Sequence, residues 1–286
     1  MTQSHALYAL MAMTAFALNS LFCRLALGAE LIDPMNFTTL RLMSGGVALM
    51  VVQHTLPVQQ TKKIDVKTRG LLGLTLFGYA LCFSLAYISL ETGTGALLLF
   101  GTVQLSLIAL HRFQGNRIRG LERLGILLSI SGFVALMLPS ASRPDLTGAA
   151  LMIISGICWS GFTLLGKTTD SAIQATKTGF SVATMMMLVA LVLYHSFYQP
   201  EVLLTIDGVM LALASGVLAS ALGYALWYRI LPKISLLQAS LMQLSVPVIA
   251  LALGVIFVAE HVSAGAMIST GLILAGIGVV NWSKGR

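Results

Sequence analysis

Two stretches of the chain carry the same pattern and decide its fold. The first, FALNSLFCR, runs from Phe16 to Arg24, and the second, WSGFTLLGK, runs from Trp159 to Lys167, 143 positions later. In both, an aromatic residue precedes a basic residue by eight positions in an otherwise apolar run. The same interval separates two further matches: Phe37 from Phe180, and Val103-Gln104 from Val246-Pro247. The chain therefore repeats itself, and we place the two halves at residues 1–141 and 142–286.

The composition around these stretches is that of a membrane protein. Apolar residues make up 57% of the 286 residues, and charged residues only 9%, against about 25% in an ordinary soluble domain. The mean hydropathy of +0.90 is an average over the whole length. Because so few charges could not cover a water-soluble globule, the composition excludes a soluble enzyme and a disordered chain.

Apolar runs long enough to cross a bilayer as helices, about 20 residues each, occur ten times. They cover residues 4–27, 35–55, 70–90, 93–112, 122–139, 146–167, 176–198, 206–229, 236–258 and 264–283. Five runs fall in each half, and an odd number makes the second half upside down relative to the first. We therefore predict an all-α membrane protein built of two inverted five-helix repeats, an arrangement typical of transporters.

The basic residues predict the orientation in the membrane. Of the 17 Lys and Arg residues, all except Arg24, Arg41 and Arg143 fall on the side that holds both termini. Because cytoplasmic loops are enriched in Lys and Arg, we expect both termini in the cytoplasm and the protein in a bacterial-type inner membrane. The net charge of +7 thus reflects topology. No basic face on a soluble element suggests a nucleic-acid partner.

Three motifs resemble those of the drug/metabolite transporter superfamily, EamA type. They are the two stretches quoted above, the run Trp227-Tyr228-Arg229-Ile230-Leu231 with its weaker counterpart Ala86–Leu90, and Pro247 followed by Glu260. In the first half, Gln104 and Arg117 replace the last pair. Members of this superfamily export amino acids, other metabolites or toxic compounds, which implies a solute site between the two repeats.

Polar and aromatic side chains at membrane depth are candidates for that site, because such groups are costly in lipid and usually face the protein interior. The candidates for substrate binding are Asn19, Tyr79, Gln104, Trp159, Thr163, Tyr224, Trp227 and Gln243. An aromatic wall with a few amides and hydroxyls suits a small amphipathic solute. Gln104 and Gln243 could instead only join helices, and Trp159 could simply pack. Pro247 is the candidate hinge, because a mid-helix proline removes a backbone hydrogen bond.

The formal charges leave one residue unexplained. We expect Glu91 and Glu260, at helix ends, to be solvated. No carboxylate lies at the centre of a span, so the sequence shows no ordinary proton relay. This favours facilitated transport, or coupling to an ion by a route that the sequence does not reveal. Arg41 lies six residues into its span. It could extend its side chain to the outer interface or attract the carboxylate of a solute.

The resemblance implies export of small amphipathic metabolites by alternating access through a central cavity, and the aromatic, polar but uncharged candidates make amino acids the leading class. Efflux of toxic compounds or of nucleosides and nucleobases is the alternative. An intramembrane enzyme is disfavoured, because the sequence has neither a nucleophile elbow nor a His-Glu-x-x-His helix. We expect no metal and no cofactor. The small residues of the last span (Ser269, Gly271, Ala275, Gly276 and Gly278) predict close packing, either within a monomer or in a homodimer.

Overall fold

The computed structural model describes residues 3–54, 64–113, 120–137, 144–167, 169–199, 201–230, 242–243 and 245–284. Within these ranges the chain is helical, and its one extended contact is an antiparallel bridge between Ile32 and Leu204. The helices are α1 (Gln3–Gly28), α2 (Pro34–His54), α3 (Val66–Ala86), α4 (Thr92–Phe113), α5 (Gly120–Met137), α6 (Leu146–Lys167), α7 (Ala172–Tyr198), α8 (Ile206–Ala214), η1 (Ser215–Leu222), α9 (Gly223–Ile230), α11 (Ser245–Val258) and α12 (Ala264–Lys284).

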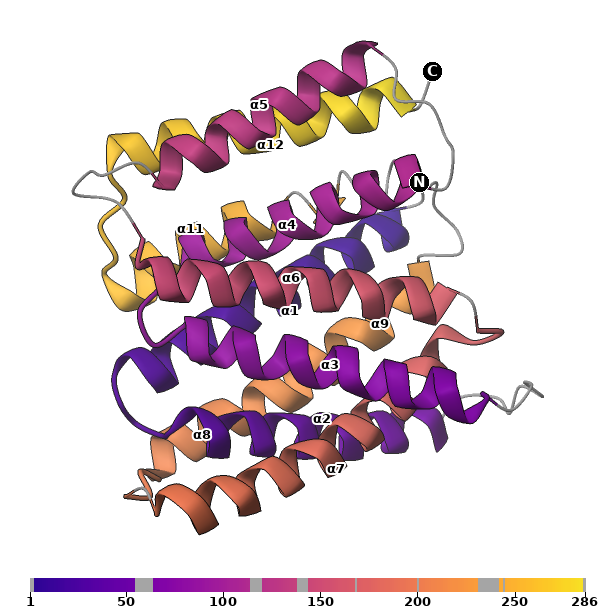
Figure 1. Ribbon diagram of the computed structural model, residues 1–286, viewed down its shortest axis with the longest axis vertical. Helices are drawn as coiled ribbons and strands as arrows, with labels where there is room; N and C mark the ends of the chain where they lie inside the picture. The colour runs from indigo at the N-terminus through magenta and orange to yellow at the C-terminus, as the bar shows by residue number, and fades with distance from the viewer. Residues whose placement is uncertain are drawn as a thin grey trace.

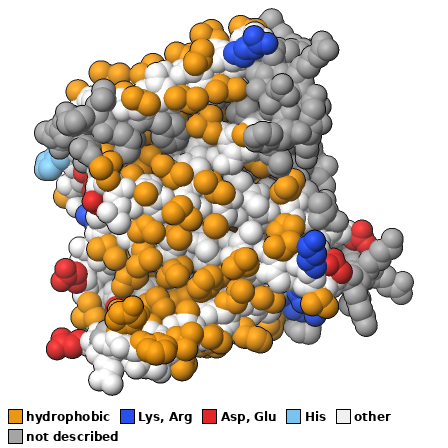
Figure 2. Space-filling model, in the orientation of Figure 1, with side chains coloured by type: hydrophobic (Ala, Val, Ile, Leu, Met, Phe, Trp, Pro, Cys, Tyr) orange, Lys and Arg blue, Asp and Glu red, His pale blue; other side chains and the backbone are white. Residues whose placement is uncertain are grey.

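The described helices make ten crossings, because α8, η1 and α9 follow one another without a break. Six crossings are long and apolar enough to span a bilayer by themselves, and three shorter apolar helices accompany them. Apolar side chains cover the middle of the molecule, and charged side chains lie toward its two ends (Figure 2). The predicted all-α membrane fold is confirmed.

The helices run back and forth between the two ends of the bundle (Figure 1). One end carries both termini, and we call it the terminal end. The other carries the link between α1 and α2, and we call it the α1–α2 end. There the Ser89 hydroxyl, just after α3, donates to Asp145 beside the start of α6 (3.1 Å). Since α1 starts at the terminal end and α6 at the α1–α2 end, the second five-helix repeat is inverted relative to the first.

Short polar side chains fix where the helices begin. In six helices such a side chain accepts a hydrogen bond from the backbone N–H three residues on, which satisfies a donor that the first turn leaves open. The pairs are Asp33 with Asn36, Asp65 with Thr68, Asp145 with Gly148, Ser171 with Gln174, Thr205 with Gly208, and Ser263 with Ala266. These caps explain why α3 and α7 each start four residues before the predicted runs.

The eighth crossing contains a feature that the apolar pattern did not indicate. Its middle, η1, is a π-helix of eight residues, a rare form whose hydrogen bonds reach five residues back and which often marks a functional site. Gly216 lets η1 lie directly on α2, because a Cβ there would meet the Arg41 carbonyl and the Ser44 hydroxyl. The π-helix therefore joins the second half to α2 of the first.

The last helices of the two halves, α5 and α12, pack on each other at one side of the bundle (Figure 1). They come into close contact at Gly125 and Gly276, where a Cβ on either residue would meet the other's carbonyl oxygen. On the same helix, Gly271 and Gly278 have open space around them. Part of the predicted small-residue surface therefore serves packing within the monomer.

We predict that Gly276→Ala lowers the thermal stability and Gly278→Ala does not. The Cβ at 276 forces α5 and α12 apart, and overpacking of this kind costs about 1–3 kcal/mol. At 278 the same change adds only the higher helix propensity of alanine. Melting of the two purified variants in one detergent measures the difference. Equal melting temperatures would contradict the packing described here.

Candidate functional site

Four polar side chains from four helices meet inside the bundle, and we call them the central cluster. Tyr79 of α3 accepts hydrogen bonds from Arg41 Nη2 of α2 (3.0 Å) and from Asn19 Nδ2 of α1 (3.3 Å). Ser215, the first residue of η1, donates to Asn19 Oδ1 (2.6 Å). All four are buried. The cluster therefore links three helices of the first half to one of the second.

Arg41 is the unusual member of the cluster. It is 2% exposed, so the first of the two alternatives, that it extends to the outer interface, is wrong. Packing of η1 against α2 encloses it. Its guanidinium lies over the rings of Tyr79 and Phe83, 5.2 and 4.9 Å from their centroids. Such contacts contribute about 0.5–2 kcal/mol each, less than the several kcal/mol needed to bury a charge. Nε and Nη1 have no hydrogen-bond partner among the described residues.

A line of aromatic rings continues from the central cluster, and we call it the aromatic column. The Tyr79 ring lies 4.7 Å from that of Trp159 on α6, and Trp159 stacks on Tyr224 of α9 at 5.4 Å. Tyr224 is 5.6 Å from Phe16 of α1, which meets Trp227 at 6.5 Å. The column thus alternates between the two halves of the chain.

The central cluster lies nearer the α1–α2 end than the terminal end. Asn19 is nine residues before the end of α1, Arg41 seven after the start of α2, and Tyr79 seven before the end of α3. At 1.5 Å per residue these positions are roughly 10–14 Å from the helix ends. The aromatic column extends from there toward α9, which ends at the terminal end (Figure 1).

The structure thus brings together Asn19, Tyr79, Trp159, Tyr224 and Trp227 of the predicted residues, and it adds Arg41, Phe16 and Ser215. No hydrogen bond or ring contact within the described ranges connects Gln104, Thr163 or Gln243 to them. Gln104 is buried on α4, and Thr163 and Gln243 are half-buried. Pro247 is buried near the start of α11, and its role as a hinge stays a prediction.

An ion pair lies at the α1–α2 end. Both carboxylate oxygens of Glu260 accept the Thr92 backbone N–H (2.8 and 2.9 Å), and Oε1 also accepts the Thr92 hydroxyl (2.9 Å). Arg24 Nε lies 3.6 Å from Oε1, and its Nη1 donates to the carbonyls of Tyr87 and Ile88. These contacts join the ends of α1 and α3 to the start of α4 and the end of α11.

The expectation that Glu260 is solvated is therefore wrong, since its side chain is only 8% exposed. The backbone turns it inward. Ala259 has a φ of 54°, the left-handed conformation that ends many helices, and the Glu260 N–H returns to the Gly254 carbonyl (3.2 Å). Gly254 leaves room for the carboxylate, which a Cβ there would meet.

A second set of contacts joins the halves at the same end. The backbone N–H of Thr205 and its hydroxyl both donate to the Leu31 carbonyl (3.0 and 2.7 Å), and the Asp33 N–H donates to the Leu203 carbonyl (3.0 Å). The α1–α2 link is thus held against the start of α8. Together with the ion pair, these bonds tie helices of the two halves to each other at this end.

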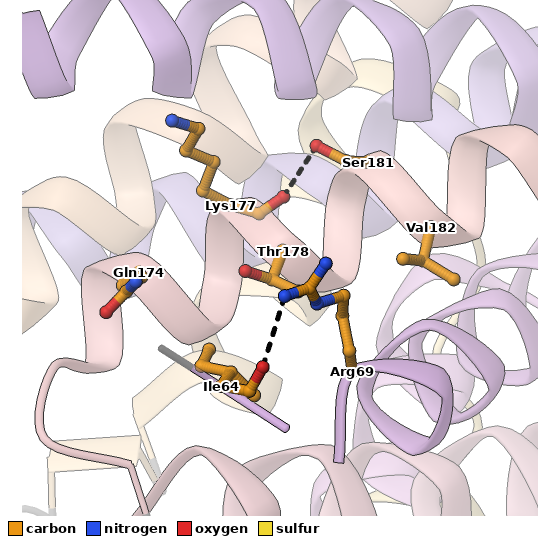
Figure 3. Close-up of a pocket in the computed structure, with 7 residues that line it drawn as sticks. All are labelled: Ile64, Arg69, Gln174, Lys177, Thr178, Ser181 and Val182. Carbon is orange, nitrogen blue, oxygen red and sulfur yellow. Dashed lines mark hydrogen bonds between the residues drawn. The ribbon is translucent and has the colours of Figure 1, made fainter. Parts of the chain in front are cut away.

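A surface pocket of about 310 Å³ lies near the starts of α3 and α7 (Figure 3). Arg69 and Lys177 line it together with uncharged polar side chains, and Arg69 Nη2 donates to the Ile64 carbonyl (3.1 Å). The pocket is at the terminal end, far from the central cluster. It marks that end as basic.

Comparison with known proteins identifies the family. The model of the EamA-like transporter family matches residues 3–138 and, a second time, residues 146–282. The chain belongs to the EamA-like transporter family. The resemblance inferred from the motifs is thereby confirmed, and the protein is a multi-pass membrane transporter rather than an enzyme.

Individual relatives agree with this assignment. An uncharacterized Pseudomonas aeruginosa protein is 40% identical, covering 96% of this chain and 93% of its own. An uncharacterized transporter of Bacillus subtilis is 24% identical over 90% of this chain and 87% of its own. A Streptantibioticus cattleyicolor protein named a probable terminal-alkyne amino-acid exporter is 23% identical, with coverage of 98% and 95%. A crystal structure with a TM-score of 0.66 and 19% identity, covering both chains completely, has the same fold.

We predict that Glu260→Ala opens the α1–α2 end. Cys23, which is fully buried one residue before Arg24, serves as the reporter in a protein whose other two cysteines are replaced by serine. Loss of charge-assisted bonds should raise its labelling rate by a polar thiol reagent in nanodiscs about tenfold. The matched control, Glu201→Ala, removes an exposed carboxylate and should change nothing. An unaltered rate in Glu260→Ala would show that other contacts close this end.

Proposed function

We propose that the protein exports small amphipathic metabolites, with amino acids as the leading class, by alternating access. The observation that carries this proposal is the central cluster with its aromatic column, because both lie at membrane depth and both draw side chains from the two inverted halves. When the two halves move relative to each other, the contacts between their side chains at such a site would break and re-form. The amino-acid exporter among the relatives supports the same class of solute.

The rings of the column touch one another in this structure, so a solute must replace some of those contacts. A flat or apolar side chain can do so, because it restores the buried area that the separated rings lose. The hydrogen-bonding head of the solute then faces the central cluster. Since one chain supplies both halves of the site, we propose the monomer as the transporting unit, with the solute and the bilayer as its partners.

The charges support an orientation with the terminal end in the cytoplasm of a bacterial-type inner membrane. Lys67, Arg69 and Lys177 lie at the terminal end, whereas Asp145, Glu201 and Asp207 lie at the α1–α2 end. Lys and Arg favour the cytoplasmic side. The α1–α2 end would then face outward, and the ion pair between Arg24 and Glu260 would be the outer closure.

The two halves differ in the charges that they carry at symmetry-related positions of this ion pair, and the difference supports export. The positions 143 residues from Arg24 and Glu260 are Lys167 and Arg117, so the symmetry-related pair carries like charges. The outer side has an ion pair between Arg24 and Glu260, which Lys167 and Arg117 could not form with each other. A resting state closed to the outside is the state that collects a solute from the cytoplasm.

The test is a counterflow screen in proteoliposomes against amino acids, nucleosides and cationic drugs. We expect exchange of at least one aromatic or aliphatic amino acid. Trp159→Ala should reduce it about tenfold or more, because alanine removes both the large apolar surface and the ring contacts that tryptophan offers a solute. Trp282→Ala, at a half-exposed position of α12, is the matched control. Exchange of nucleosides or cationic drugs alone would contradict the proposed substrate class, and exchange of no solute would contradict the proposed function.

The orientation has its own prediction. In a cysteine-free background, Glu201→Cys should react with a membrane-impermeant maleimide in intact cells, and Lys67→Cys should react only after the cells are made permeable. Both residues are exposed on the surface, so access to the side chain does not differ between them. The reverse pattern would place the termini outside.

A further inference from the structure

The guanidinium of Arg41 lacks a counterion and most of its hydrogen-bond acceptors among the described residues. The guanidinium carries five N–H donors, yet of its nitrogens only Nη2 has a hydrogen-bond partner, the uncharged Tyr79 hydroxyl. Within the described ranges no carboxylate forms an ion pair with it. We propose that Arg41 binds the carboxylate of the transported solute. This inference rests on the proposed function and names the part of the solute that the central cluster recognises.

The neighbouring groups favour an anion over a neutral or cationic solute. A guanidinium and a carboxylate match in charge and in the geometry of two parallel hydrogen bonds. A neutral nucleobase would leave the buried charge without a counterion, and a cationic drug would be repelled. The Tyr79 and Phe83 rings over which Arg41 lies exclude water, which strengthens an ion pair formed there.

Tyr79 is placed to take part in the same recognition. Its oxygen accepts from Arg41 and from Asn19, and neither bond uses the phenolic hydrogen, which is left to donate to a third group. Asn19 is fixed in turn by Ser215. A carboxylate beside Arg41 would therefore receive hydrogen bonds from a cation and a phenol that are already held in position.

Other polar groups nearby do not compete for the carboxylate. The single hydrogen of the Thr38 hydroxyl has two acceptors within reach, the Ser84 hydroxyl oxygen (2.8 Å) and the Pro34 carbonyl (2.7 Å), and the Ser84 hydroxyl donates to the Ala80 carbonyl (3.0 Å). These side chains satisfy one another and their own helices. Arg41 and Tyr79 are thus the described groups of this region with donors left for a carboxylate.

The position of Arg41 also sets the direction in which the solute lies. The aromatic column starts at Tyr79 and runs toward the terminal end, so an apolar side chain would lie along it while the carboxylate points toward the α1–α2 end. An exported solute would then travel with its carboxylate leading. Its passage would require the ion pair between Arg24 and Glu260 to open ahead of it.

The experiment uses the full-length protein in nanodiscs and isothermal titration calorimetry with three probes. L-phenylalanine has a carboxylate and an amine, 3-phenylpropionate only the carboxylate, and phenethylamine only the amine. Wild type should bind both carboxylates at least about tenfold more tightly than the amine. Arg41→Met should weaken carboxylate binding about 10- to 100-fold, and Arg41→Lys should weaken it less because it keeps the charge.

Two controls separate binding from folding. Lys67→Met removes a surface cation and should leave all three affinities unchanged. The melting temperature of Arg41→Met should equal or exceed that of wild type, because an apolar side chain relieves an unpaired buried charge, whereas a purely structural role would lower it.

The possible failures are distinct. Carboxylate binding by Arg41→Met that equals wild type, equal affinities of wild type for the three probes, or a lowered melting temperature with unchanged probe preference would each overturn the inference and leave the proposed function standing. If wild type binds none of the probes and the counterflow screen is negative throughout, the inference and the proposed function both fail.

Discussion

The hydrogen-bond chain from Arg41 through Tyr79 and Asn19 to Ser215 is the interaction on which the rest of the arrangement depends. Polar groups in the interior of a membrane protein cannot turn to water, so each must find a partner in the bundle. This requirement sets the rotation of α1, α2 and α3 about their own axes and draws η1 against them. With these helices fixed, the rings of Trp159 and Tyr224 are held beside Tyr79, and the two halves meet around one site.

Sequence patterns were sufficient for the ten crossings and the inversion, because span length, charge bias and the interval of 143 residues are each properties of the chain itself. Five of the eight candidate residues lie together in the structure, and their role in binding stays a prediction. Asn19, Tyr79 and Trp159 could be found since a polar or aromatic group at membrane depth is conspicuous. Arg41 and Glu260 were harder. Whether a charge near a helix end reaches the interface or turns inward depends on what packs over it: η1 encloses Arg41, and the left-handed Ala259 turns Glu260 inward. Ser215 gave no signal, because its role comes from a π-helix that apolar periodicity does not reveal.

The closure at the α1–α2 end combines two kinds of interaction with different consequences. The backbone N–H bonds of Asp33 and Thr205 do not depend on side-chain identity, whereas the Thr205 hydroxyl bond and the ion pair of Arg24 and Glu260 do. The symmetry-related positions, Lys167 and Arg117, carry like charges and cannot form the same ion pair with each other. Two repeats that share a fold can thus differ in the side-chain contacts at their ends.

The π-helix in the eighth crossing also bears on how such a bundle can move. A π-helical turn contains more residues than an α-helical turn. Successive side chains in η1 are therefore rotated by a smaller angle about the helix axis than those in the flanking α-helices. Conversion of η1 to an α-helix would rotate the part of the crossing after Leu222 about the helix axis. Tyr224 and Trp227 would then face another direction, while Ile206–Ala214 stays in place. The eighth crossing would in this way contain a fixed helix, α8, and a rotating helix, α9. The π-helix that connects them lies beside Arg41 and Asn19.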